Sequence, residues 1–343
     1  MKKLPYILIV GALIIGAGIY LEATKDSSTA ITKQMLESGD SDVDVEFKNY
    51  GKAPEFTGLG TWLNSEPLKL SELRGKVVLV DFWTYSCINC VRTLPYLTHW
   101  DETYRDKGLV VIGIHTPEFG FEAVTKNVET ALKRHNIKYP VAQDNDYMTW
   151  NAFSNRYWPA KYLIDQNGDI VYTHFGEGNY EETETAIQKL LGVSSTIDTS
   201  PEQKTGKVGS PEMYFGFNRL EYLESPQRPQ KDTQKYTFPS KLGLNSFALD
   251  GTWKLEAEKA VLTSDFGRIK LKFNAGKVYM VANGTNNAKR TFMEVKVDGV
   301  VVQTIAIDSS MLYKLFESND YREHELELYI DTPGFEAFTF TFG

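Results

Sequence analysis

The sequence predicts an α/β domain followed by an all-β domain, behind an apolar N-terminal segment. Two continuous apolar runs, at residues 77–82 and 109–114, with a stretch of helical spacing between them, predict a parallel β-α-β unit. After about residue 210, short alternating segments replace the long apolar runs, which indicates an all-β domain. With 343 residues, of which 42% are hydrophobic, the chain is long enough to bury two cores.

The N-terminus combines a basic start with an apolar run. Lys2 and Lys3 precede residues 4–21, a length close to the minimum that spans a bilayer. No clear small-x-small cleavage motif follows, so residues 1–23 are expected to form a single uncleaved signal anchor rather than a cleaved signal peptide. The positive-inside rule then places the body outside, in an extracytoplasmic location at the cell membrane. Residues 24–44, rich in Ser, Thr, Asp and Lys, are expected to form a tether.

Two cysteines lie where the first apolar run gives way to the predicted helix. Leu94, Leu97 and Trp100 recur at helical spacing, so Cys87 falls at the N-terminus of that helix. Free backbone N–H groups and the helix dipole favour a thiolate at such a position. Cys87 is therefore the expected nucleophile, and Cys90, one turn further on, is the expected resolving thiol.

Other uses of this pair are less favoured by the sequence. A purely structural disulfide between residues three apart constrains very little chain, and its stabilisation is small. A zinc site needs two more ligands, and the nearest candidate, His99, has no partner at a recognisable spacing. We therefore expect no metal and no bound cofactor, since the electrons would reside in a redox-active Cys87–Cys90 disulfide. The net charge of −8 also argues against a nucleic-acid partner.

The segments around the cysteines resemble the thioredoxin superfamily. Asp81 stands six residues before Cys87 in Val-Asp-Phe-Trp, and Trp158-Pro159 precedes a second apolar run. The resemblance implies that Asp81 relays a proton to or from Cys90, because a buried carboxylate is costly unless it is protonated or used. It also implies that Pro159 is a cis-proline shaping the groove for a substrate strand, with Trp158 as its wall. An aspartate merely hydrogen-bonded at a strand end and an ordinary trans proline are the alternatives.

The first domain is expected over residues 45–192. An insertion of about 40 residues before Pro159, absent from plain thioredoxins, resembles TlpA-like proteins and peroxiredoxins. In chain order, we expect an opening hairpin and turn at 53–75, a helix at 121–135, a strand at 139–142, a helical turn at 147–153, a hairpin joining 162–164 to 170–172, and a helix at 181–191.

Residues 193–210 are expected to be a polar linker and residues 211–343 a jelly-roll β-sandwich of seven or eight strands. The expected strands are 252–257, 268–273, 278–282, 292–297, 300–307, 325–330 and 337–342. Tyr214, Phe215, Tyr222 and Trp253 are aromatic residues of the kind that stack on sugar rings, but aromatic side chains in a sandwich also form its core. Both readings stay open.

Longer motifs resemble the extracytoplasmic half of DipZ proteins, which are thiol-disulfide carriers of the CcdA-linked type. The resemblance covers roughly residues 45–343 and is carried by segments 83–90, 113–119, 144–147, 156–160, 175–178 and 338–343. It implies a thiol-disulfide oxidoreductase that acts on protein thiols and disulfides and carries a carbohydrate-binding-like β domain, with a cell-wall glycan as a further partner. Because one anchor replaces that family's multi-spanning domain, electrons would come from a separate CcdA-type membrane protein.

The direction of electron flow is less clear. Many TlpA-like reductases keep a glutamate three residues after the second cysteine, where this chain has Thr93, whereas the thioredoxin-like Asp81 favours a reductase or isomerase. A peroxiredoxin-like peroxidase and a cell-wall or carbohydrate-binding protein are the alternative functions. Against the peroxidase, this chain lacks the proline that peroxiredoxins have before their reactive cysteine. A binding protein would leave the two cysteines unexplained. His115, Glu118 and His174 fall in motifs near the pair and are left outside the predicted site.

Overall fold

The computed structural model describes residues 45–194, 208–284 and 290–343. The expected anchor (1–23) and tether (24–44) lie outside these residues, and so does most of the expected linker. Within the described ranges, no helix combines the length and the apolar character needed to cross a membrane.

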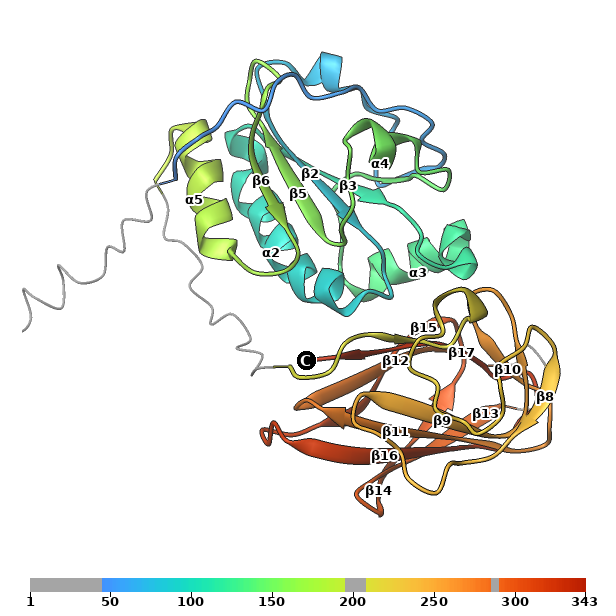
Figure 1. The fold of residues 1–343 in the computed structure, drawn as a ribbon. Coiled ribbons are helices and arrows are strands. Elements are labelled where there is room, and N and C mark those ends of the chain that lie inside the picture. Colours follow the sequence, from blue (N-terminus) through green and yellow to red (C-terminus); the bar gives the residue numbers. More distant parts are fainter. Residues whose placement is uncertain (1–44, 195–207, 285–289) are drawn as a thin grey trace, which may run out of the picture. The chain divides into compact units, whose positions relative to one another are not determined.

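A six-stranded sheet forms the centre of the first domain (Figure 1). Its order is β1-β4-β3-β2-β5-β6, in which β2 pairs in parallel with β3 and antiparallel with β5. The strands are Trp62–Leu63 (β1), Val77–Trp83 (β2), Leu109–His115 (β3), Val141–Gln143 (β4), Ala160–Ile164 (β5) and Ile170–Phe175 (β6). All seven residues of β2 are buried. This is expected for a central strand that is covered on both faces.

Helices cover both faces of this sheet. They are Ile88–Tyr104 (α2), Thr125–Arg134 (α3), Met148–Ala152 (α4) and Tyr180–Leu191 (α5). α2 and α5 lie side by side (Figure 1), and Trp100 and Tyr104 of α2 both donate hydrogen bonds to Glu184 of α5. On the other face, Trp150 of α4 packs edge-on against Phe82 of β2. Side chains alternate along a strand, so Asp81 faces α2.

Two local predictions for this domain were wrong. The expected opening hairpin does not form, because the short strand β1 pairs with β4 instead. The expected helix at 121–135 is divided into a 3-10 helix, Gly120–Ala123, and α3, since Val124 between them has an extended backbone (φ −77°, ψ 113°). The carboxylate of Glu122 caps the first of these two segments by accepting the backbone N–H of Phe119. The remaining predicted elements agree to within a few residues.

The second domain is all-β, as predicted, but it has more strands than expected. Its described residues form Met213–Tyr214 (β7), Thr233–Tyr236 (β8), Ser246–Leu255 (β9), Ala260–Leu262 (β10), Gly267–Asn274 (β11), Lys277–Asn283 (β12), Thr291–Val297 (β13), Val300–Ile307 (β14), Met311–Glu317 (β15), Glu323–Ile330 (β16) and Glu336–Phe342 (β17). The sequence analysis missed β7, β8, β10 and β15. β7, β8 and β10 are short or polar, so they give too few alternations to be recognised, whereas the length of β15, seven residues, does not explain its omission.

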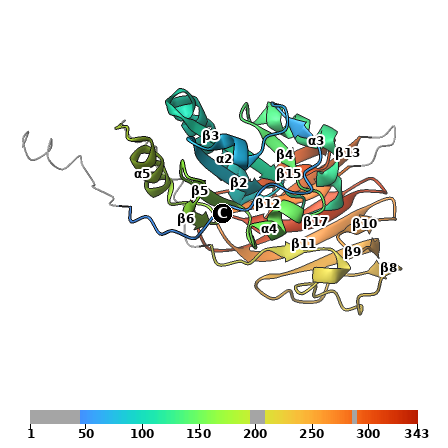
Figure 2. The same ribbon diagram turned by 90° about the horizontal axis from the view of Figure 1, so that it is seen from above.

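The strands of this domain form two facing layers (Figures 1 and 2) joined through β9. β9 pairs with β11 up to Asp250 and with β10 from Trp253 onward. Between them, Gly251 adopts φ +102°, a conformation that glycine tolerates and other residues rarely adopt. At the far edge, the Gln303 side chain of β14 donates to the Lys314 and Leu315 carbonyls of β15. The predicted jelly-roll sandwich is therefore better described as a nearly closed barrel.

Candidate redox site

Cys87 lies at the N-terminus of α2, as the sequence predicted. It is the N-cap residue with extended backbone angles (φ −76°, ψ 119°), and its Sγ accepts the backbone N–H of Cys90 at 3.5 Å. Both cysteines are free thiols, with Cys87 half-buried and Cys90 only 1% exposed. The Cys87 thiol is therefore accessible from solvent, whereas the Cys90 thiol is not.

The environment of Cys90 keeps its thiol protonated. Burial raises its pKa well above the ordinary value, and the hydrogen bond to Cys87 raises it further. The nearby charge of Asp81 acts in the same direction. Cys90 therefore needs a base to take its proton before it can attack.

Asp81 is the residue that the resemblance implied as that base, and its charge acts on Cys90. It is 1% exposed on the face of β2 that is turned toward α2, and burial raises its pKa to about 7, against the opposing effect of the Lys161 charge. Among the described residues, neither of its carboxylate oxygens has a hydrogen-bond partner. The alternative of an aspartate merely hydrogen-bonded at a strand end does not fit this environment. A carboxyl group with a pKa near neutrality can both accept and release a proton.

Lys161 is a charged member of the site that the sequence analysis missed. It lies directly opposite Asp81 in the antiparallel pairing of β2 with β5 and is fully buried. Its Nζ donates to the Gly176 carbonyl at 3.4 Å and lies 5.6 Å from the centre of the Tyr180 ring. Burial lowers its pKa, and the Asp81 charge opposes that shift. The sequence feature that could have identified Lys161 is the presence of a lysine within the apolar run that follows Pro159.

Pro159 and Trp158 lie at the same end of the sheet as the cysteine loop. The Trp158–Pro159 peptide bond is cis, as the resemblance implied, and β5 begins at the next residue, opposite Phe82. The Trp158 indole donates to the Thr116 carbonyl at 3.1 Å, and its ring centroid lies 4.3 Å from that of Trp150. Trp158 is therefore held from two sides. Its predicted role as a groove wall stays a prediction.

Glu122 is a second buried group that the sequence analysis missed. Its Oε1 accepts a hydrogen bond of 2.5 Å from the hydroxyl of Ser86, which immediately precedes Cys87. Its Oε2 accepts the backbone N–H groups of Glu118 and Phe119 at 2.6 and 2.9 Å. The carboxyl group therefore joins the cysteine loop to the loop that follows β3. The spacing of residues in the sequence gives no indication of this contact between Glu122 and Ser86.

The three residues left outside the predicted site have other partners. His115 is fully buried, its ring stacks on Tyr85 with 5.6 Å between centroids, and burial lowers its pKa to about 3. Glu118 accepts hydrogen bonds from Arg219 at 2.8 Å and from Tyr214 at 3.0 Å. His174 lies 3.2 Å from the carbonyl oxygen of Glu177.

The aromatic residues considered for sugar binding are mostly packed inside the protein. Trp253 and Phe215 are fully buried in the core of the second domain. The guanidinium group of Arg219 covers the Tyr214 ring at 3.4 Å. Tyr222 is half-buried and packs against the same core. The core-packing alternative therefore describes Trp253 and Phe215, and Tyr214 is already occupied by Arg219.

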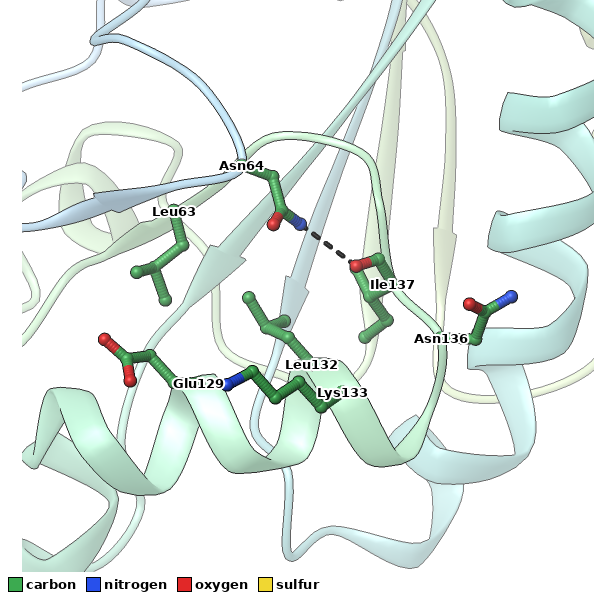
Figure 3. A pocket seen from close by; sticks show the side chains of 7 residues that line it. All are labelled: Leu63, Asn64, Glu129, Leu132, Lys133, Asn136 and Ile137. Atoms are coloured by element: carbon green, nitrogen blue, oxygen red, sulfur yellow. Dashed lines mark hydrogen bonds between the residues drawn. The ribbon is translucent and has the colours of Figure 1, made fainter.

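Other candidate sites are chemically poorer. Across the part of the chain that the structure describes, no cluster of three or more His, Cys, Asp or Glu side chains is arranged to hold a metal ion. A pocket of about 360 Å³ lies between Leu63 and α3 (Figure 3). Glu129 and Lys133 line it, and its Asn64 amide already donates to the Ile137 and Tyr139 carbonyls. None of the predicted site residues lines this pocket.

Comparison with protein families matches both domains. Residues 48–191 match the Redoxin family, and residues 210–343 match the family described as the thioredoxin-like C-terminal domain. Protein DipZ of Mycobacterium bovis is 37% identical over 316 residues, which cover 88% of this chain and 44% of DipZ. The chain thus spans less than half the length of that relative.

Shorter relatives match the first domain alone. The thiol-disulfide oxidoreductase ResA of Bacillus cereus is 32% identical over 148 residues, which cover 43% of this chain and 82% of ResA. The thiol-disulfide oxidoreductase YkuV of Bacillus subtilis is 28% identical over 138 residues, or 40% of this chain and 93% of YkuV. Among solved structures, a putative thiol:disulfide interchange protein DsbE from Chlorobium tepidum is 27% identical, with a TM-score of 0.38, over 43% of this chain and 100% of that chain.

Proposed function

Because the chain belongs to the thioredoxin-like thiol-disulfide oxidoreductases, we propose that it exchanges disulfides with protein substrates through Cys87 and Cys90. The observation that carries this proposal is the placement of the two thiols. Cys87 is accessible at the N-terminus of α2, and Cys90 is buried directly behind it. Such a pair can attack a disulfide and then resolve the mixed disulfide within the same loop.

In the first step, the Cys87 thiolate attacks one sulfur of a substrate disulfide. A bond forms between Cys87 and that sulfur, and the other substrate sulfur leaves as a thiolate. The N–H group of Cys90, which points at the Cys87 sulfur, and the N-terminus of α2 favour the negative charge before attack. The substrate segment is proposed to lie beside Pro159 and Trp158.

In the second step, Cys90 attacks the Cys87 sulfur of the mixed disulfide. Its proton passes to Asp81, the Cys87–Cys90 bond forms, and the second substrate sulfur leaves. Two electrons have then moved from the cysteine pair to the substrate, so no bound cofactor is required. Lys161 lies opposite Asp81 and stabilises its charged form, while a pKa near 7 allows Asp81 to accept this proton and later release it.

We further propose that the protein acts as a reductase outside the cytoplasm and receives electrons from a CcdA-type membrane protein. The similarity to DipZ over 88% of this chain and the apolar segment at residues 4–21 support this assignment. A cell-wall glycan is proposed as a partner of the second domain on the DipZ resemblance alone. The buried Trp253 and Phe215 give that second proposal no support.

The first test is reduction of insulin disulfides by the full chain with dithiothreitol as electron source. Cys87→Ser is expected to reduce the rate to the uncatalysed background, and unchanged catalysis by this variant would overturn the proposal. The direction of electron flow is tested by equilibrating the Cys87–Cys90 pair with thiol buffers and trapping the thiols. A reduction potential of about −250 mV or lower supports the reductase, whereas one near about −120 mV identifies an oxidant.

A further inference from the structure

A buried carboxyl group is attached to the residue that precedes the nucleophile. Glu122 is fully buried, and its contact with Ser86 brings the carboxyl group to the cysteine loop from the side of the loop after β3. The steps proposed above for Cys87 and Cys90 make no use of it. A fully buried carboxylate destabilises the folded state unless its charge is compensated, so its presence here calls for an explanation.

The groups around Glu122 show how its charge is controlled. Burial raises its pKa to about 7, and the hydrogen bonds from the Ser86 and Thr84 hydroxyls oppose that shift. Glu122 also interacts electrostatically with three other titratable groups: Glu118 on its own loop, Tyr85 on the cysteine loop and Tyr147 before α4.

The cation nearest to Glu122 among these groups, Arg219, pairs with Glu118 and not with Glu122 itself. Arg219 pairs with Glu118 at 2.8 Å, whereas the hydrogen bonds of Glu122 come from neutral hydroxyl and backbone N–H groups. Glu118 itself opposes the ionisation of Glu122. The charge on Glu122 is therefore uncompensated by a nearby cation among these partners. On the cysteine loop, burial raises the pKa of Tyr85, and the Glu122 charge raises it further.

We propose that Glu122 is a positioning residue for the Cys87 nucleophile, acting through Ser86: it fixes the backbone that presents Cys87, and its ionised form opposes the Cys87 thiolate. This inference rests on the proposed use of Cys87 as a nucleophile. It adds a second buried carboxyl group to the site, separate from Asp81. Asp81 serves the resolving thiol from the sheet, whereas Glu122 tunes the attacking thiol from the loop after β3.

Two substitutions separate the charge of Glu122 from its hydrogen bonds. In Glu122→Gln, the amide oxygen can still accept the two backbone N–H groups and the amide nitrogen can donate to Ser86, so that only the charge is lost. In Ser86→Ala, the carboxyl group stays but loses the hydroxyl donor that favours its ionised form. Both variants therefore reduce the negative charge near Cys87 at neutral pH, the first completely and the second in part.

The experiment measures the rate at which iodoacetamide alkylates Cys87 between pH 5 and pH 9 in the full chain, with mass spectrometry to identify the modified cysteine. In Glu122→Gln, the pH midpoint of the reaction is expected to fall by about half a unit, equivalent to about threefold faster alkylation at pH values well below the wild-type midpoint, where the rate follows the small thiolate fraction. Ser86→Ala is expected to shift the midpoint in the same direction by a smaller amount.

Glu184→Gln is the matched control. Glu184 is also a buried glutamate of the first domain, but its carboxylate accepts from Trp100 and Tyr104, away from the cysteine loop. Its alkylation profile is expected to coincide with that of the wild type. Coincident profiles for Glu122→Gln and the wild type would overturn the inference. If Glu122→Gln does not fold, an unshifted profile for Ser86→Ala would overturn it. Insulin reduction, measured on the same samples, reports separately on the proposed function.

Discussion

The two domains bury different kinds of side chain. In the first domain, six charged residues are buried: Asp81, Asp101, Glu122, Asp144, Lys161 and Glu184. In the second domain, no Asp, Glu, Lys or Arg is buried among the described residues, and the core is built from apolar side chains around Trp253, Phe247 and Phe273. The charged residues of the second domain instead form ion pairs on its surface, such as that between Arg268 and Asp250.

This difference indicates which domain carries out the chemistry. Buried charges reduce stability unless they are paired or hydrogen-bonded. Asp101, Asp144 and Glu184 have such partners, whereas neither carboxylate oxygen of Asp81 has one among the described residues. Asp81, Lys161 and Glu122 all lie around the two cysteines. The second domain has the features of a stable scaffold, and its core contributes stability without offering a comparable reactive group.

The largest effect is expected from removing the resolving thiol. In Cys90→Ser, Cys87 still attacks a substrate disulfide, but no second thiol can release the product, so the mixed disulfide accumulates and turnover stops. Mass spectrometry without reductant measures this adduct on Cys87. Turnover at the wild-type rate in Cys90→Ser would show that resolution of the mixed disulfide does not depend on Cys90. The first domain would then not act through two thiols.

A core substitution in the second domain should change stability while leaving the cysteine chemistry unchanged. Trp253 is fully buried, and its indole donates to the Asp250 carbonyl at 2.9 Å. Trp253→Ala is expected to lower the free energy of unfolding by about 3–5 kcal/mol, measured by chemical denaturation. The exposed Phe292 provides the control, since Phe292→Ala should change that free energy by less than about 0.5 kcal/mol. Slower alkylation of Cys87 in folded Trp253→Ala would break the proposed separation of roles.

Local patterns in the sequence were sufficient to place the cysteine loop. The apolar run before Cys87 and the helical spacing after it lie within about twenty residues, and they specify a strand followed by a helix. Lys161 and Glu122 could not be found in this way. Lys161 belongs to the site because the register of β2 and β5 places it opposite Asp81. Glu122 belongs to it because its loop folds back onto Ser86. Both contacts join segments far apart in the chain, and hydrophobic periodicity does not report such contacts.

The same limit explains the errors in the second domain. β10 has only three residues, and the four residues of β8 are mostly polar, so neither shows the alternation that identifies a strand. These strands form because neighbouring strands supply their hydrogen-bond partners. β9 was predicted to start at residue 252 but begins at Ser246, because its first half pairs with β11 before Gly251 redirects the chain.

Removing the proposed base should slow the second step of exchange. In Asp81→Asn, the Cys90 proton has no acceptor, so release of product from the mixed disulfide is expected to slow by about one hundredfold at pH 7. Stopped-flow measurement of product release after rapid mixing with a model disulfide reports this step. Attack by Cys87 should proceed as before. If both steps slowed equally, Asp81 would act on the structure of the site and not on the Cys90 proton.

The pH dependence of stability gives an independent check on Asp81. Its pKa is raised in the folded protein, from 3.8 to about 7, so the folded state holds a proton between about pH 4 and pH 7 that the unfolded chain has released. The contribution of this group to stability is therefore present at low pH and is lost as the pH rises through about 7. Asp81→Asn should remove this decline, and melting temperatures at pH 5 and pH 8 will measure it. The double variant with Lys161→Met controls for the coupling between the two residues.

The smallest effect is expected on the outer face of the second domain. Glu327 pairs with Arg268 at 3.2 Å and with Lys270 at 3.5 Å, and both cations have further acidic partners. Glu327→Gln is expected to lower the free energy of unfolding by less than about 1 kcal/mol, because these side chains are only partly buried and ion pairs near the protein surface contribute little. In 1 M NaCl, screening shortens the Debye length to about 3 Å, and the difference from the wild type should become smaller still. A difference that does not respond to salt would mean that Glu327 stabilises the sheet through packing or hydrogen bonding, and the contrast between buried and surface charge would then need another explanation.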